Sequence, residues 1–185
     1  VATANAHVAT RDVTISNSTF AHGGNDDYGI FFDNALPATL SNNTFTDNGY
    51  DAIGATLTDN ADSITLSNNH AAGNRINGLT VHGTLSGAVT WDWDGGDTLP
   101  FVIGRYLASD LTVNAGATLS LTPGTALKFY DDYNDLWVNG TLIAEGTDAA
   151  PITFTSVKDD TVGGDTNGDG SATSPAGADW GGLYS

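Results

Sequence analysis

Residues 165–170 read Asp-Thr-Asn-Gly-Asp-Gly, a spacing that suits a calcium ion. The oxygen-bearing side chains of Asp165, Asn167 and Asp169 stand at alternate positions, and a glycine at the sixth position allows the sharp turn of such a loop. Ser171 stands where a backbone carbonyl ligand is expected. The sequence therefore predicts a Ca²⁺ site in this segment, and a solvated Gly/Asp loop is the alternative.

The bidentate glutamate that closes an EF-hand loop is missing, because Ala176 occupies its position. An acidic residue from outside the motif must then complete the site, and Asp159, Asp160 and Asp179 are candidates. The expected set of metal ligands takes one of these three together with the motif. It consists of Asp160, Asp165, Asn167, Asp169 and Ser171.

The composition is strongly acidic. Of the 185 residues, 22 are acidic and five are basic, which gives a formal net charge of −17. All but one of the acids are Asp, a turn residue as well as an oxygen ligand. We expect no binding to nucleic acid or to anionic lipid, since both need a basic face. Two further acidic groups are weaker metal candidates, with turns as the simpler interpretation: Asp92, Asp94 and Asp97, and Asp131, Asp132, Asn134 and Asp135.

Three stretches with a common frame precede the motif. Each contains a short strand pattern followed by Ser-Asn, and the aligned serines Ser16, Ser41 and Ser67 lie 25 and 26 residues apart. A strand and an asparagine turn that recur at one period indicate a solenoid, in which each coil stacks on the one before. The three stretches are 13–20, 38–45 and 64–71.

Stacked parallel coils lie about 4.8 Å apart, so equivalent side chains of successive coils should touch. The frame predicts a polar ladder in which side-chain amides hydrogen-bond from coil to coil, and this ladder is structural. Its members are Asn17, Asn42 and Asn68. The frame also predicts two apolar stacks, Ile15/Leu40/Leu66 and Ile30/Ile53/Leu79.

The whole chain is expected to be all-β. No helix-length stretch has a 3.6-residue periodicity with flanking caps, and short runs of Val, Ile, Leu, Thr and Phe alternate with Gly/Asn/Asp clusters. We predict one domain, 1–185, of roughly seven coils. It divides into S-N-x-x-F coils over 1–90, a crossover over 91–110, and a second coil set over 111–185 that carries a Gly/Asp loop at 159–178.

The second half resembles the right-handed parallel β-helix repeat proteins of the pectin-lyase-like superfamily, and in particular modules of large secreted or cell-surface microbial proteins. The resemblance covers about half of the chain, and the S-N-x-x-F frames match the same superfamily more loosely. It implies a right-handed parallel β-helix and an extracellular or cell-surface location, but no particular reaction. The residues that carry it are 111–129, 136–147, 151–156, 165–170 and 179–182.

Both ends of the solenoid are expected to be open and uncapped. Residues 1–9 are too short for a helical cap, and 180–184 read as the start of a strand. The segment that opens a module in the proteins of the resemblance stands second here, and the chain has no methionine. We therefore expect part of a longer or processed protein. Uncapped solenoids pair at their edges, which predicts head-to-tail self-association into a filament, or contact with neighbouring modules of the same polypeptide.

Other functions fit the residues less well. A polysaccharide lyase of this fold would pair calcium-binding aspartates with a basic residue, but Arg75 stands where other coils carry polar loop residues, so we expect no enzyme. The alternative is a carbohydrate-binding adhesin or a polysaccharide-processing domain, in which tryptophans stack on sugar. The Thr-x-Thr pairs give no continuous row, which disfavours ice binding. No apolar run is long enough for membrane insertion.

Overall fold

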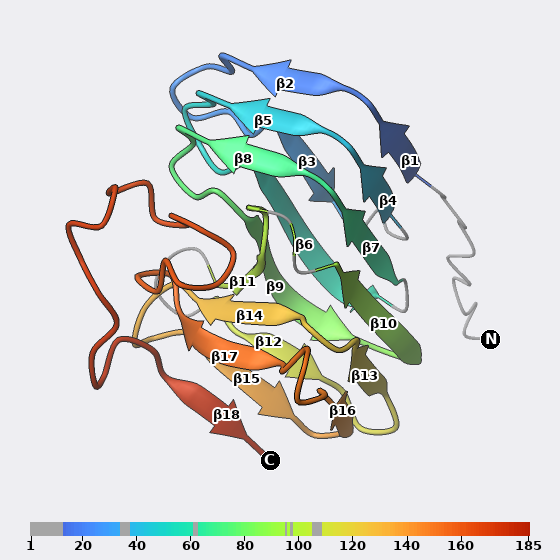
Figure 1. Cartoon of the computed structure of the whole chain (residues 1–185). Coiled ribbons are helices and arrows are strands. Elements are labelled where there is room, and N and C mark those ends of the chain that lie inside the picture. The colour runs from blue at the N-terminus through green and yellow to red at the C-terminus, as the bar shows by residue number, and fades with distance from the viewer. Residues whose placement is uncertain (1–12, 34–37, 61–62, 95, 97, 105–108) are drawn as a thin grey trace.

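The computed structural model describes residues 13–33, 38–60, 63–94, 96, 98–104 and 109–185. Within these ranges the chain forms strands and no helix. Successive strands return to the same face after each coil and pair in parallel with their counterparts, so the coils stack along one axis (Figure 1). The fold is a right-handed parallel β-helix, as the sequence predicted.

Three sheets run along the axis. Sheet A has six strands: β1 (Val13–Ser16), β4 (Ala38–Ser41), β7 (Ile64–Ser67), β10 (Ala88–Trp93), β13 (Thr118–Leu121) and β16 (Thr141–Ala144). Sheet B has three strands: β2 (Thr19–Ala21), β5 (Thr44–Thr46) and β8 (His70–Ala72). Sheet C has nine: β3 (Ile30–Asp33), β6 (Ile53–Asn60), β9 (Leu79–Leu85), β11 (Phe101–Ile103), β12 (Leu111–Val113), β14 (Ala126–Phe129), β15 (Asp135–Val138), β17 (Thr153–Ser156) and β18 (Gly182–Tyr184).

The core follows from the inward alternation of apolar residues in these strands. Both predicted stacks are confirmed by the strand registers. The first, on sheet A, continues from Leu66 to Trp93, and the second, on sheet C, continues from Leu79 to Phe101. The buried aromatic side chains therefore take positions that aliphatic side chains fill in the earlier coils.

The number of coils was overestimated. Six strands on sheet A define about five turns, not roughly seven. The reason lies in sheet C, where the two halves of β9 pair with two separate short strands, β11 and β12, of one coil. Gly83 lies where β9 divides; it has a φ of +109°, and a Cβ there would lie 2.0 Å from the carbonyl oxygen of Leu57. The two short strands therefore belong to one coil, which lowers the number of turns.

The predicted crossover over 91–110 needs correction at its start. Trp91 and Trp93 belong to β10 and pair with Ile64 and Leu66 of the preceding coil. Both indole rings are buried, so this coil continues the stack. The tryptophans change the sequence frame without changing the backbone geometry, which is why the repeat was not recognised there.

The predicted asparagine ladder occupies the outer side of a turn. Asn17, Asn42 and Asn68 all have left-handed backbone, with φ values of 52°, 55° and 52°. The side-chain amide of Asn68 donates to the side-chain oxygen of Asn42 at 2.6 Å, and this contact is exposed. The left-handed residue turns the chain, so it is the next side chain that points inward.

The buried ladder therefore lies one residue later. The side-chain oxygen of Asn69 accepts from the backbone N–H of Asn43 at 3.1 Å and from its side-chain amide at 3.0 Å. Each amide also donates to a backbone carbonyl of the preceding coil, that of Ile15 at 2.9 Å for Asn43 and that of Leu40 at 2.8 Å for Asn69. The side-chain oxygen of Asn43 in turn accepts from the backbone N–H of Ser18. This ladder satisfies backbone groups that the turn would otherwise leave unpaired.

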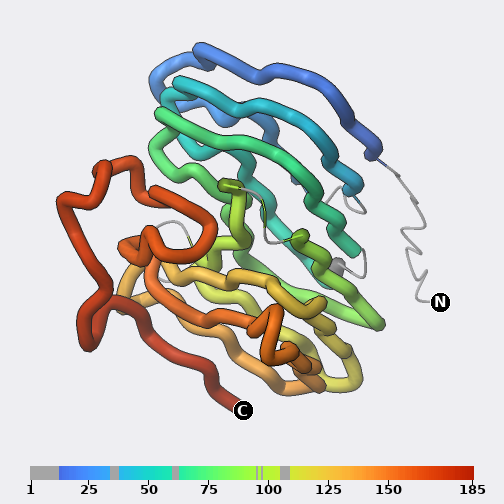
Figure 2. The backbone as a smooth tube through the Cα atoms, in the orientation of Figure 1, coloured from blue at the N-terminus to red at the C-terminus, as the bar shows by residue number. Residues whose placement is uncertain are grey.

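Sheet B ends after β8, while sheets A and C continue. From β10 onward the described residues that connect sheet A to sheet C form no strand at that corner. The long segment 157–181 between β17 and β18 lies beside this corner. It contains the predicted Gly/Asp loop, 159–178, and the whole segment is called the Gly/Asp loop from here on. Figure 2 shows this orange-to-red segment on the side of the stack where β5 and β8 end.

The last strands of the described chain have a strand partner on one side only. β16 pairs with β13, β17 with β14, and β18 with β15. At the other end β1, β2 and β3 each pair with one later strand. The prediction about an N-terminal cap concerned residues 1–9, which lie outside the described residues.

Candidate metal centre

The Gly/Asp loop is attached to the coil stack through its backbone. Asn77, which follows β8, donates from its N–H to the carbonyl of Thr166 at 2.8 Å and from its side-chain amide to the carbonyl of Asp165 at 2.8 Å. A Cβ at Gly168 would lie 3.2 Å from the carbonyl oxygen of Asn74, so glycine permits a close approach of the two backbones. The calcium motif is therefore held against the corner that sheet B vacates.

A second ladder of buried asparagines ends at this motif. The side-chain oxygen of Asn74 accepts from the N–H and the amide of Asn48, at 3.1 and 2.8 Å. That of Asn77 accepts from the N–H and the amide of Asn74, at 3.1 and 3.0 Å. Asn77 then donates to Asp165. The sequence analysis did not predict this second ladder, although Asn48 follows β5 and Asn74 and Asn77 follow β8 in the sequence.

Three carboxylates converge in the loop. Asp160, Asp165 and Asp169 each offer an oxygen, and the three oxygens lie within 4.8 Å of one another. Each residue is partly buried. In the described part of the chain, this is the group of three Asp, Glu, His or Cys side chains whose ligand atoms lie close enough together to hold one metal ion. The sequence motif supplied Asp165 and Asp169, and the fold supplies Asp160 as the third.

The motif itself forms a tight turn around Asp165. Its carboxylate accepts from the backbone N–H groups of Asp169 and Gly170, at 3.0 and 2.9 Å. Gly168 and Gly170 have φ values of 70° and 68°, which glycine adopts without a steric penalty. The turn thereby brings the carboxylates of Asp165 and Asp169 to one side of the loop.

Two buried oxygens at this centre lack a hydrogen-bond partner among the described residues. They are one carboxylate oxygen of Asp160 and the side-chain oxygen of Asn167. The amide nitrogen of Asn167 donates to the carboxylate of Asp169 at 2.8 Å, so its oxygen is turned away from that bond. Buried acceptors are usually satisfied, and carboxylate and amide oxygens are the ligands that Ca²⁺ prefers. A cation would satisfy both atoms.

The electrostatics differ between the acids of the loop. Burial, and then the negative charges of Asp165 and Asp169, raise the pKa of Asp160 above its ordinary value of 3.8. The hydrogen bond from the Thr173 hydroxyl, with further bonds from Ser171, Asn167 and Ala172, lowers the pKa of Asp169. Asp160 is therefore the acid that gains most from a neutralising cation.

The other candidate ligands have different roles. The carboxylate of Asp159 accepts from Thr161 and Thr155, and these hydrogen bonds outweigh its burial, so its pKa is lowered. Asp179 pairs with Lys158 at 2.5 Å, which lowers the pKa of Asp179. Ser171 has a φ of 92° and donates its N–H to Asp169.

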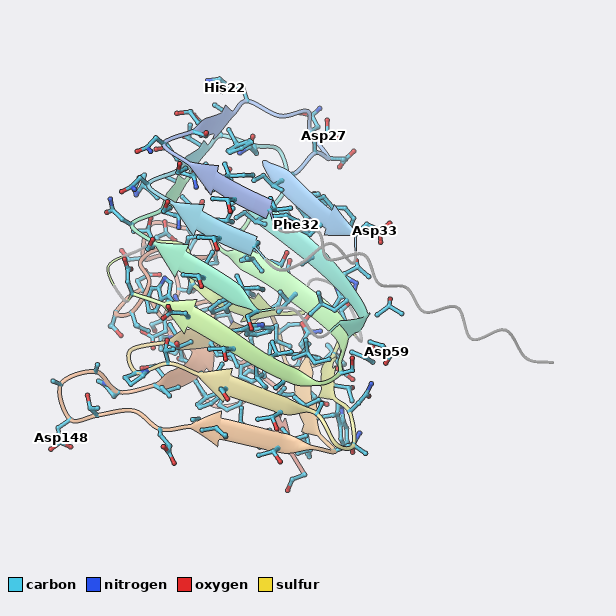
Figure 3. The ribbon with its side chains drawn as sticks, turned by 90° about the vertical axis from the view of Figure 1, so that its right-hand side faces the viewer. His22, Asp27, Phe32, Asp33, Asp59 and Asp148 are labelled. Atoms are coloured by element: carbon cyan, nitrogen blue, oxygen red, sulfur yellow. The ribbon has the colours of Figure 1, made fainter. Side chains whose placement is uncertain are left out.

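Outside the loop the acidic groups serve turns and coil contacts. Asp92 accepts from the hydroxyl of Thr122 at 2.8 Å, and Asp94 from the backbone of Asn68 at 2.9 Å. Asp131 accepts from the N–H of Tyr133. Asp97 lies outside the described residues. Many other acids lie at the surface; Asp27, Asp33, Asp59 and Asp148 stand on loops and strand ends in Figure 3.

Comparison with known families agrees with this architecture. Residues 4–90 match the family model described as the right handed beta helix region. Comparison with curated proteins and with solved structures finds no significant match. In the part of the chain that the structure describes, no helix has the length and apolar character needed to cross a membrane. The matched coils and the parallel stacking of the strands show that the chain adopts the right-handed parallel β-helix fold, and this fold is consistent with the pectin-lyase-like superfamily.

Proposed function

We propose that this protein is a non-catalytic, structural β-solenoid that a calcium ion stiffens and that associates end to end with neighbouring solenoids. The observation that carries the proposal is the convergence of Asp160, Asp165 and Asp169 beside two unsatisfied buried oxygens. The loop that bears these acids has no regular secondary structure and contains no disulfide, since the chain has no cysteine. An ion shared by three carboxylates would join its two arms.

Calcium is the preferred ion on chemical grounds. The donors are carboxylate and amide oxygens on a glycine-rich loop, and such a flexible oxygen set suits the irregular coordination of Ca²⁺ better than the strict octahedron of Mg²⁺. Neither histidine nor cysteine contributes to the group. Calcium-dependent modules of modest affinity are typical of the extracellular space, which supports a location outside the cell or at its surface.

End-to-end association is supported by the strands that close the described stack. β16, β17 and β18 have partners on one side only, so their outer backbone groups are available to another strand. Ile143, Leu183 and Tyr184 on these strands are 39%, 44% and 43% exposed. The partner would be a second copy or a neighbouring module of the same polypeptide, and a head-to-tail contact between copies produces an open filament.

Sedimentation velocity and electron microscopy of the chain at micromolar concentration test the association. We expect linear assemblies in calcium, and shorter or fewer assemblies after chelation, because an ordered loop holds the last coils in register. Isolated monomers in both conditions would remove the end-to-end part of the proposal and leave the metal site to be judged by calcium binding alone.

Carbohydrate binding is the second candidate, and one surface favours it. Trp137 and Tyr184 stack at 4.7 Å on the outer face of sheet C, and both are partly exposed. The indole N–H of Trp137 donates to Asp110 at 3.2 Å, which places a carboxylate beside the rings. Aromatic faces with adjacent polar groups bind sugars. Binding of wild type but not of Trp137→Ala to a glycan array would favour this function.

A further inference from the structure

Lys128 is a buried cation that the sequence reasoning did not single out. It lies in β14 between Leu127 and Phe129, which face the main core, so its own side chain points to the outer side of sheet C. The Gly/Asp loop covers that side, and the relative exposure of Lys128 is 0%. A lysine is almost never fully buried unless its ammonium is paired.

All three donors of this ammonium are directed at the loop. The Nζ atom lies 2.7 Å from the carbonyl oxygen of Asp159, 3.3 Å from that of Gly164 and 2.6 Å from the hydroxyl oxygen of Thr166. No carboxylate lies within ion-pair distance of it among the described residues. An ammonium has three N–H donors, so the geometry leaves none unused.

The three acceptors lie next to the metal candidates in sequence. Asp159 precedes Asp160, and Gly164 and Thr166 flank Asp165. Lys128 is therefore bonded to both arms of the loop whose carboxylates converge. Asn77 holds the second arm from the other side, through the carbonyls of Asp165 and Thr166.

The electrostatic environment of Lys128 agrees with this arrangement. Burial lowers the pKa of Lys128 from 10.5 to about 8, and the negative charges of Asp159, Asp160 and Asp165 oppose that shift. Neutral oxygens supply the direct contacts, while the carboxylates act from a longer distance. The acids thus remain available for another cation.

We propose that Lys128 is a positioning residue: its buried ammonium docks the Gly/Asp loop in the corner vacated by sheet B and thereby brings Asp160 and Asp165 together before any ion binds. The reason for bringing these carboxylates together, namely metal binding, rests on the proposed function. The docking itself does not depend on that function, so the two can fail separately.

A simple electrostatic role predicts the opposite sign in a binding experiment. A positive charge near the carboxylates repels Ca²⁺, so removing the charge alone would raise calcium affinity. Removing a positioning contact would lower the calcium affinity, because binding of the ion must then also order the loop, which is entropically unfavourable. The direction of the change in the variant Lys128→Met distinguishes the two roles.

The experiment compares three variants with wild type. Lys128→Met removes the ammonium but keeps an unbranched apolar stem, and Thr166→Val removes one acceptor while the charge remains. The control Lys158→Met removes the same unit of charge from the other lysine, whose Nζ binds Asp179 at 2.5 Å instead. Hydrogen exchange of metal-free protein reports docking through the backbone amide of Asn77, which donates to Thr166 of the loop, and reports the order of the loop through that of Asp169, which donates to Asp165 within it.

We expect exchange at these two amides to accelerate about tenfold or more in Lys128→Met, and calcium affinity to fall by a similar factor in calorimetry. Terbium in place of calcium should retain more bound water in this variant, as measured by its luminescence lifetime in H₂O and D₂O. Thr166→Val should shift the exchange rate and the affinity in the same direction by less. Lys158→Met should leave both within about twofold of wild type.

The proposal is overturned if the loop amides of Lys128→Met remain as protected as those of Lys158→Met, or if its calcium affinity rises. Should Lys128→Met lose its far-ultraviolet β signal, Thr166→Val decides alone, and unchanged protection there overturns the proposal. If wild type binds no calcium while Lys128→Met loses loop protection, the docking role stands and the calcium function falls.

Discussion

At the scale of single residues, Asp160 decides whether the loop behaves as a metal site. Its neighbours Asp159 and Asp179 have hydrogen bonds that stabilise their ionised forms, whereas one carboxylate oxygen of Asp160 is buried without a partner among the described residues. Burial and two nearby carboxylates raise its pKa. An ionised Asp160 is thus unfavourable in the metal-free protein, and a bound cation reverses that penalty.

Substitution Asp160→Asn should weaken calcium binding about 10- to 100-fold, because one charge-assisted ligand contact of roughly 1.5–3 kcal/mol is lost. In the absence of calcium the same variant should be as stable as wild type or more stable, because it relieves repulsion with Asp165 and Asp169. Calorimetry and thermal unfolding with and without calcium measure the two effects. The control is Asp148→Asn, which changes an exposed acid outside the Gly/Asp loop (Figure 3). Equal affinities for both variants would contradict the assignment.

The raised pKa of Asp160 also predicts a pH dependence. The folded, metal-free protein retains this proton above pH 3.8, where the unfolded chain has lost it. Its contribution to stability is therefore full below pH 3.8 and is lost as pH rises through the raised pKa. Calcium needs the ionised form, so affinity should increase over the same window. Titrations from roughly pH 4 to pH 7 should show a steeper increase for wild type than for Asp160→Asn.

At the scale of elements, the buried asparagine ladder holds the corners of successive coils. Asn69→Ala should destabilise the protein by about 2–4 kcal/mol, because buried groups of Asn43 and Leu40 lose their partners. Asn68→Gly should change stability by less than about 1 kcal/mol, since glycine accepts the left-handed turn and the lost contact is exposed. Denaturant unfolding compares the variants, and similar losses for both would contradict the ladder.

Periodicity predicted the elements of the first coils, because Ser16, Ser41 and Ser67 recur in one frame and pair across sheet A. The same method lost the frame at β10, where tryptophans replace aliphatic residues, and it assigned β11 to a crossover although this strand pairs with β9. Whether an asparagine faces inward depends on the backbone φ of the residue before it. That is a property of the turn rather than of the repeat.

The candidate site was predictable in part for a related reason. Spacing identified Asp165, Asn167 and Asp169, because consecutive residues of a tight loop converge by local geometry alone. Asp160 could be offered only as one of three candidates. Lys128 had no local signal, since its contacts with the loop span 31 to 38 residues and depend on the coil to which the loop returns.

At the scale of the whole molecule, a net charge of −17 opposes association, and exposed strand edges favour it. Leu183→Lys should abolish end-to-end assemblies, because it places a charge on the last strand, where the apolar side chain is 44% exposed. Thr112→Lys on β12 is the matched control, since β12 already pairs on both sides. Sedimentation velocity measures the difference, and identical assembly by both variants would exclude this edge.

The central claim is that one ion binds between the arms of the Gly/Asp loop. A crystal structure grown with millimolar calcium, with anomalous data, tests it most directly. The account predicts a single strong anomalous peak coordinated by Asp160, Asp165 and Asp169, with oxygen distances of about 2.3–2.6 Å. A loop in which these carboxylates contact only water or protein donors at that concentration would contradict the claim.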